Sequence, residues 1–313
     1  MLTYKVVPRL NFEELRTFVA VVELGSFSLA ADNLCRTTAA VSYRMKCLEN
    51  SLGVALFDRH ARGVKLTPAG DWLYGKARDL LLWQQHIPDE ISAVKNGVES
   101  RFTLILNNLL YDANCVAALI TMIKDRYPYT QIKVTRSVFN GVWDSLIYDE
   151  GSLAIGTPSF HSLDQAFLTH PLGVIEWHLV ASPIHPLALK KQVTENDLKP
   201  YPVVNIEDSS FHLQKRLPWR LNGQDEILVP DLRTKLACHL NGLGVGFLPY
   251  SMIKSHLENG TLVEIQTEEP LRSSSPMAMA WAKNNDGQIS QWVRHLIISR
   301  DPVVLPLLQP ISS

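Results

Sequence analysis

Four residues near the N-terminus, Ala39, Ser42, Tyr43 and Lys46, are spaced three or four positions apart or lie side by side. Residues with this spacing share one face of an α-helix. The face is small, hydroxylic and basic, and it carries no carboxylate. Small residues permit close approach to the DNA major groove, hydroxyls reach base edges and cations meet phosphates. The residue types therefore indicate contact with double-stranded DNA, and the alternative is a face that meets only solvent.

Three short helices must hold this face in place. Apolar residues at helical spacing predict the first helix: Leu15, Phe18, Val19 and Val22. A second helix opens at Ser26 or Ser28, and a third runs from Thr38 to about Asn50. A short helix, a tight turn and a second helix of this kind make a helix-turn-helix. The candidate DNA contacts are Arg36, Thr37, Thr38, Ala39, Ser42, Tyr43, Lys46, Arg59 and Arg62.

A β-hairpin is predicted directly after the third helix. Segments 56–59 and 64–66 are short and extended, and the connection between them ends in Gly63, which can adopt a positive φ. Arg59 and Arg62 lie on or beside this hairpin, where cations can neutralise DNA phosphates. The hairpin therefore predicts a basic wing that extends the candidate DNA-binding surface.

The order of these motifs is similar to that of a known family. The matching segments are 18–28, 30–31, 41–42, 48–49, 52–53, 56–59 and 66–70. They resemble the N-terminal signature of LysR-type transcriptional regulators, although many members carry a proline followed by alanine where this chain has Ala39-Ala40. The resemblance implies an α/β protein with a winged helix-turn-helix, a long linker helix and a two-lobed effector-binding domain like periplasmic solute-binding proteins. It also implies a double-stranded DNA operator, a small-molecule effector, RNA polymerase as a partner, and a homodimer or homotetramer.

A seven-residue apolar repeat follows the hairpin, at Leu73, Leu80, Ile87 and Val94. Such a repeat forms a seam along a helix that pairs with a partner helix. A helix from residue 68 to about residue 96 would be roughly 43 Å long at 1.5 Å per residue. We therefore expect dimerisation through this seam, and the alternative is a single helix packed on its own chain. Pro88 lacks a backbone donor, so we also expect a kink or break near it.

Strand-like and helix-like segments alternate from Arg101 onward, which predicts an α/β domain with a mostly parallel sheet. The predicted domains are the winged helix-turn-helix at 11–66, the linker helix at 67–97 and the effector-binding domain at 98–313. Within the last, lobe I comprises 98–171 and 270–313, and lobe II comprises 172–269. The chain is expected to cross between the lobes near 170–174 and 268–275.

Hydrogen-bonding residues fall near the ends of the predicted strands: Asn107, Asn108, Asn140, Thr157, Asn205 and Glu207. Ligands of open α/β sheets bind at the carboxyl ends of strands, so these residues are the candidate effector contacts. Asn107 and Asn108 also lie at an expected helix start, where free N–H groups favour an anionic or carbonyl-bearing ligand. The set suits a small polar metabolite. For each asparagine alone, the alternative is a helix cap or a turn.

The C-terminal half narrows the resemblance to one subgroup of the family. The matching segments are 107–111, 141–146, 204–209 and 246–249. They resemble regulators of purine and allantoin nitrogen metabolism, which implies an activator whose effector is a purine or ureide derivative.

Composition excludes several other classes of protein. The 313 residues carry a net charge of −1, and the four cysteines are too far apart for a zinc ribbon or a disulfide framework. The sequence has no metal-ligand motif, no catalytic motif and no membrane-length apolar run, so we expect no cofactor, no enzyme activity and no membrane partner. The N-terminus does not resemble a secretory signal, which predicts a cytoplasmic protein. The remaining alternative is a solute-binding protein without a role in gene regulation.

Overall fold

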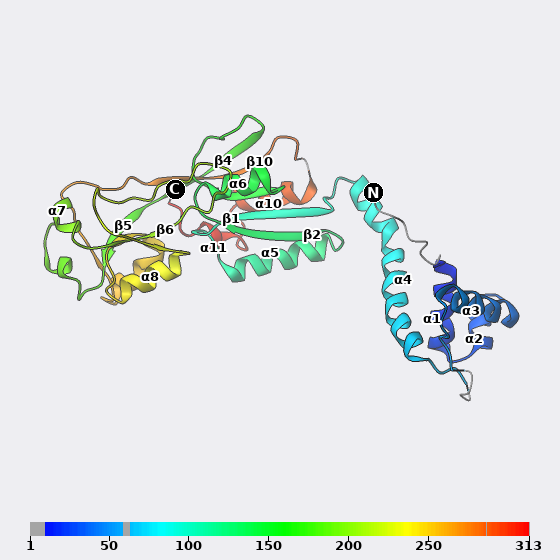
Figure 1. Ribbon diagram of the computed structural model, residues 1–313. Helices are drawn as coiled ribbons and strands as arrows, with labels where there is room; N and C mark the ends of the chain where they lie inside the picture. The colour runs from blue at the N-terminus through cyan, green and yellow to red at the C-terminus, as the bar shows by residue number, and fades with distance from the viewer. Residues whose placement is uncertain (1–9, 59–62, 286, 313) are drawn as a thin grey trace. The chain divides into compact units, whose positions relative to one another are not determined.

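The computed structural model describes residues 10–58, 63–285 and 287–312, and these form two compact units that divide after Ser92 (Figure 1). The first unit contains α1 (Phe12–Leu24), α2 (Phe27–Asn33), α3 (Thr38–Leu52) and most of α4 (Pro68–Lys95). The caps of the first three helices are Asn11, Ser26 and Thr37, whose side chains accept backbone N–H groups of the first turn. The three predicted helices are therefore confirmed.

Helix α4 is one continuous helix of 28 residues. A break at Pro88 is therefore a wrong prediction. Pro88 cannot donate to the carbonyl of Gln84, but both residues are exposed, so water can satisfy that carbonyl. Within the described residues, even this helix is too polar to cross a membrane, and the other helices are shorter.

The second unit is built on a five-stranded sheet in the order β2-β1-β3-β10-β4. Its strands are β1 (Arg101–Asn107), β2 (Gln131–Ser137), β3 (Leu153–Thr157), β4 (Phe167–Ile175) and β10 (Ser275–Ala282). Strand β1 pairs in parallel with β2 and β3, whereas β10 is antiparallel to both β3 and β4. The expectation of a mostly parallel sheet is wrong, because β10 returns from lobe II in the opposite direction.

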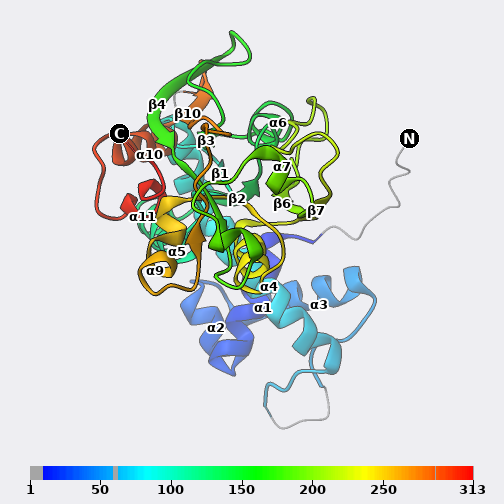
Figure 2. The same ribbon diagram turned by 90° about the vertical axis from the view of Figure 1, so that its left-hand side faces the viewer.

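Alternate residues of the sheet point to opposite faces, and helices cover both of them (Figure 2). Leu104 and Leu106 pack with α5 (Ala113–Arg126), α10 (Gln288–Ile298) and α11 (Leu305–Leu308). Ile105 points the other way and packs with Val142, Trp143 and Leu146 of α6 (Gly141–Tyr148). This sheet and its helices form lobe I.

Lobe II lies between β4 and β10 in the chain. Its elements are β5 (Trp177–Ala181), α7 (Glu195–Leu198), β6 (Val203–Ile206), β7 (Glu226–Val229), α8 (Leu232–Leu240), β8 (Gly246–Pro249), α9 (Tyr250–Glu258) and β9 (Val263–Glu264), with a 3-10 turn at Pro186–Leu189. The first predicted crossing, 170–174, is wrong because those residues lie inside β4. The second, 268–275, overlaps residues 265–274 between β9 and β10, but Ser275 itself begins β10.

Candidate functional sites

Helix α3 separates an apolar side from a polar side, as the sequence predicts. Val41, Met45 and Leu48 are buried in the core of the first unit. The predicted DNA-contacting residues of this region are all exposed: Arg36, Thr37, Thr38, Ala39, Ser42, Tyr43 and Lys46. The buried side fixes the helix, so the exposed side is held as a rigid face that is open to a ligand. Sequence reasoning therefore predicted the orientation of this face.

The hairpin after α3 is present in the described residues. Phe57 forms an antiparallel bridge with Leu66, and the Asp58 N–H donates to the carbonyl of Lys65 at 2.8 Å. Gly63 has a φ of +90°, as its place in the turn requires. Arg59 and Arg62 lie outside the described residues, so their predicted phosphate contacts stay predictions.

The hairpin also has an anchor that sequence reasoning missed. The Glu49 carboxylate on α3 accepts the N–H of Leu56 at 2.7 Å and that of Phe57 at 3.3 Å. Two hydrogen bonds to one charged acceptor hold the base of the hairpin against the end of α3. The spacing of Glu49 from the hairpin carries no helical or strand period, so no local pattern pointed to this contact.

The predicted seam of α4 is exposed over most of its length. Leu80 is 39% exposed and Val94 56%, and Ile87 is half-buried. Leu73 differs, because it is buried in the core of the first unit, against α1 and α3 residues. Leu73 is therefore corrected from a dimer contact to a core residue, and the candidate seam shortens to the other three residues, joined by the exposed Ile91.

A cavity partly open to solvent lies at the carboxyl ends of β1, β2 and β3, where residues of lobe I and lobe II meet. Its lining is Asn107, Asn108, Leu109, Val138, Phe139, Pro158, Trp177, Ile206, Arg216, Leu232, Ser275 and Met277. Eight of these are apolar, so the cavity is less polar than the strand-end residues suggested. Only Asn107 and Asn108 of the six predicted contacts line it.

The other four predicted contacts bond within the protein. The Thr157 hydroxyl donates to the carbonyl of Ala278 at 3.1 Å, and the Asn140 amide donates to that of Gln214 at 2.9 Å. The Asn205 amide nitrogen is also engaged, because it donates to the carbonyl of Trp219 and to the Glu226 carboxylate. Glu207 forms an exposed ion pair with Lys215. Thr157 therefore binds β10, the other three side chains bind loop residues, and none of the four lines the cavity.

The two asparagines at the cavity are themselves constrained. The Asn107 amide donates to the carbonyl of Gly156 at 2.7 Å and its oxygen accepts the Leu109 N–H at 3.0 Å. The Asn108 N–H donates to the carbonyl of Ser137 at 2.8 Å. The expected helix start at these residues is wrong, because α5 begins later, at Ala113, with Asp112 as its cap. Free helix N–H groups are therefore not available beside Asn107 and Asn108.

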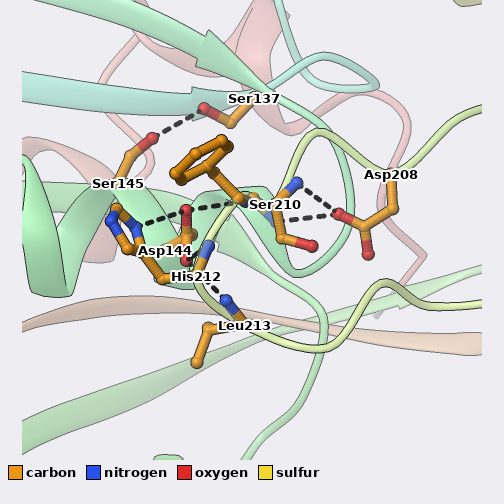
Figure 3. A network of polar contacts seen from close by, with 9 residues as sticks. Ser137, Asp144, Ser145, Asp208, Ser210, His212 and Leu213 are labelled. Carbon is orange, nitrogen blue, oxygen red and sulfur yellow. Dashed lines mark hydrogen bonds and ion pairs between the residues drawn. The ribbon is translucent and has the colours of Figure 1, made fainter.

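An aspartate on α6 binds a loop of lobe II to lobe I (Figure 3). The buried Asp144 carboxylate accepts the N–H groups of Phe211 at 2.9 Å, His212 at 3.0 Å and Leu213 at 2.9 Å. Burial acts to raise the pKa of Asp144, but the three N–H donors outweigh it and hold the pKa below its usual value. The charged carboxylate therefore fastens the loop to α6.

A second aspartate, Asp208, completes this contact from the lobe II side (Figure 3). Its carboxylate accepts the N–H groups of Asn140 and Gly141 at 3.1 Å each, and that of Arg216 at 2.8 Å. A Cβ at position 141 would collide with the Ser209 hydroxyl, so the close approach requires glycine. Asp208 thus fixes the backbone of Arg216, whose side chain lines the cavity.

Sequence reasoning missed the arginines of this region. Arg216 lies in a loop rather than at a strand end, and its guanidinium stands 5.8 Å from the Phe139 ring centroid. The guanidinium of Arg272 lies over Trp177, 3.6 Å from its ring centroid. The Trp177 indole in turn donates to the Ser275 hydroxyl at 2.9 Å. Only the fold brings these loop residues to one place, so no sequence period could have found them.

Two family profiles match the chain. Residues 12–71 match the bacterial regulatory helix-turn-helix protein, lysR family, and residues 98–299 match the LysR substrate binding domain. The HTH-type transcriptional activator AllS of Salmonella paratyphi A is 44% identical over 297 residues, which cover 95% of this chain and 96% of that protein. AllS of Klebsiella pneumoniae is 47% identical over 255 residues, 81% of this chain and 94% of that protein.

More distant proteins are similar as well. The HTH-type transcriptional regulator PunR of Escherichia coli is 30% identical over 275 residues, 88% of each chain. Among solved structures, a mutant of Corynebacterium glutamicum OxyR covers 96% of each chain with a TM-score of 0.60 at 17% identity. At that identity the likeness extends to the fold alone.

Proposed function

The chain belongs to the LysR family of bacterial regulatory helix-turn-helix proteins, and we propose that it activates transcription when a small metabolite occupies the cavity of its second unit. As a family member it is a DNA-binding regulator rather than an enzyme. The observation that carries the proposal is the exposed polar face of α3, which is fixed in place because the opposite side of the helix packs in the core. The name of the AllS relatives, transcriptional activator, supports activation.

We propose that the exposed residues of α3 and the turn before it read the operator, with Arg59 and Arg62 on the hairpin as phosphate contacts. Selection of bound sequences from random duplex DNA tests this. Ser42→Ala should broaden the selected sequence, because a lost base-edge contact costs about 1–3 kcal/mol of discrimination. An unchanged selected sequence would contradict the assignment of α3 as the reading helix.

We propose that the protein is a cytoplasmic dimer or tetramer joined through α4, and that it contacts RNA polymerase at the promoter. The exposed Leu80 and Val94 and the half-buried Ile87 form a seam that supports helix pairing. The proposed domains remain 11–66, 67–97 and 98–313. Analytical ultracentrifugation of the full chain gives the oligomeric state, and transcription in vitro with purified polymerase tests activation.

We propose that the effector comes from purine or ureide nitrogen metabolism. The regulators AllS and PunR support this pathway by similarity to the whole chain, and the cavity supplies a site lined by residues of both lobes. A thermal-shift screen of purine breakdown products tests the proposal, because a ligand of the native state raises the apparent stability. A hit should also alter the DNase footprint on the selected operator, and hits that leave it unchanged count against an effector role.

A further inference from the structure

The charge of the cavity rests on one side chain. Of the described residues that line it, Arg216 alone is charged. No described carboxylate lies within ion-pair distance of its guanidinium, although two lie close by in sequence. Asp208 accepts backbone N–H groups, including that of Arg216 itself, and Glu207 pairs with Lys215. The Arg216 guanidinium therefore faces the cavity without an internal counter-ion among the described residues.

Two further cations lie behind the cavity wall. Arg272 stacks on Trp177, and burial together with the charge of Arg216 lowers its pKa to about 9. Lys235 of α8 is buried, and burial together with the charge of Arg272 lowers its pKa to about 7. Arg272 therefore lies within the electric field of Arg216, and Lys235 lies within that of Arg272.

Negative charge in this region is scarce. Among the described residues, Glu226 is the carboxylate that acts on Lys235, and it already accepts the Asn205 amide at 2.7 Å and lies 3.6 Å from Arg220. The buried His239 adds no charge, because burial and Lys235 lower its pKa to about 3. Arg272 is partly buried and Lys235 is buried, whereas Arg216 is exposed at the cavity. Buried cations that outnumber their counter-ions are costly, and an anion bound beside them relieves that cost.

The other residues that line the cavity favour an organic ligand with an unsaturated skeleton. Phe139 and Trp177 present ring systems beside the two guanidinium groups, and Ile206, Leu232 and Met277 close the cavity with apolar surface. Such a wall favours a ligand with a flat or compact carbon–nitrogen skeleton rather than a free inorganic ion.

We infer that the effector is an organic anion whose carboxylate or equivalent oxyanion pairs with Arg216 while its skeleton packs between Phe139 and Trp177. This inference rests on the proposed function, since it takes the cavity as the effector site. The strand-end asparagines had predicted a neutral polar ligand. An organic anion replaces that expectation, because the asparagine amides bond within the protein or lie in a largely apolar wall.

Matched pairs of ligands test the charge requirement by calorimetry on the full-length protein. Allantoate and urate carry a negative charge at neutral pH, and allantoin and hypoxanthine are uncharged members of the same two classes. We expect the charged member of at least one pair to bind more than tenfold tighter. The variant Arg216→Gln should lose roughly 10- to 100-fold in affinity for the anion, the usual size of a hydrogen bond to a charged group, and little for the neutral compound.

Neighbouring variants separate this role from a structural one. Lys215→Gln removes the same charge one residue away, from a side chain outside the cavity lining, and should bind the anion like the wild type. Arg216→Lys should keep part of the affinity. Neutral ligands that bind as tightly as their charged partners, or an Arg216→Gln variant with wild-type anion affinity, overturn the inference.

A second set of ligands tests the anion inference separately from the purine and ureide proposal. If none of the four compounds binds, benzoate and succinate are compared with benzamide and succinamide. An Arg216-dependent preference for the carboxylates supports the inference while removing the purine and ureide proposal, and no preference in this set overturns the inference. Binding of selected DNA by the ligand-free protein tests the DNA-reading role independently of both results.

Discussion

Positively charged side chains are exposed at the proposed DNA-binding face of the first unit and buried behind the cavity of the second. On α3, Lys46 is exposed on a face that also carries Ser42 and Tyr43. In lobe II, Lys235 is buried behind the cavity, beside Arg272. An exposed cation is screened by dissolved salt, whereas burial shields a cation from that screening and lowers its pKa. We therefore expect ligand binding to depend on salt in the first unit and on pH in the second.

The largest expected effect is a loss of operator affinity that leaves effector binding by the second unit unchanged. Leu80→Asp places a charge in the proposed α4 seam, where burial without a partner costs several kcal/mol. A protein that cannot pair its helices cannot engage two half-sites at once, so operator affinity should fall at least about 100-fold. Effector affinity measured by calorimetry should stay at the wild-type value. Gln85→Asp, on another face of the same exposed helix, is the matched control, and a Leu80→Asp variant with wild-type mass and DNA affinity would refute the seam.

The next effect is confined to the second unit. Asp144→Ala removes a charged acceptor from three backbone N–H groups. Each such bond contributes about 1.5–3 kcal/mol, so this unit should lose about 3 kcal/mol or more of unfolding free energy. The exposed Asp149→Ala should change stability little. Differential scanning calorimetry distinguishes the units, and an unshifted transition of the second unit in Asp144→Ala would contradict the role of this carboxylate.

The stabilisation by Asp144 also has a defined pH dependence. Its pKa is lower in the folded protein than in the unfolded chain. The stabilisation is therefore fully present above the unfolded value of about 4 and is lost as pH falls through the lowered folded value. Asp144→Asn should remove this acid-dependent component and be less stable at pH 7. Thermal unfolding from pH 7 to pH 3 measures the difference, and parallel curves for the variant and the wild type would contradict it.

A smaller effect sharpens the contrast in salt sensitivity. Lys46→Gln should weaken binding to all duplex sequences alike and lower the slope of log affinity against log salt by about one unit. Anion binding in the cavity should depend on salt less, because it involves the single exposed side chain of Arg216 rather than several phosphate contacts. Titrations from low to high potassium chloride measure both slopes. Equal slopes for DNA and for the cavity ligand would remove the contrast.

The smallest effect concerns protons at the cavity. Lys235, with a pKa of about 7, faces Arg272, Glu226 and His239. A bound anion should raise this pKa, so binding at pH 8 should take up a fraction of a proton and affinity should fall as pH rises above 7. Calorimetry in buffers of different ionisation enthalpy measures the uptake. The control variant Lys235→Met should show no such proton uptake. Equal uptake in the variant and the wild type would mean that a group other than Lys235 takes up the proton.

The exposed face of α3 was predictable from sequence because its residues follow one helical period, as do Val41 and Met45 on the buried side. The cavity was predictable only in position, at the carboxyl ends of strands. Arg216 and Phe139 come from loops whose meeting depends on the whole chain topology, and their own sequence carries no period. Strand β4 runs through the crossing predicted at 170–174, and its Pro171 is tolerated because β4 lies at a sheet edge.

The two crossings between the lobes lie next to each other, since Ile175 at the end of β4 pairs with Ser275 at the start of β10. Everything between them leaves and returns at one point of the sheet. Lobe II is therefore inserted in lobe I as a cassette with adjacent ends, the arrangement that best tolerates the exchange of a segment. Residues 176–274 can be designed as a transplantable module, in which a lobe from a related protein brings a new cavity wall while β4 and β10 keep their pairing.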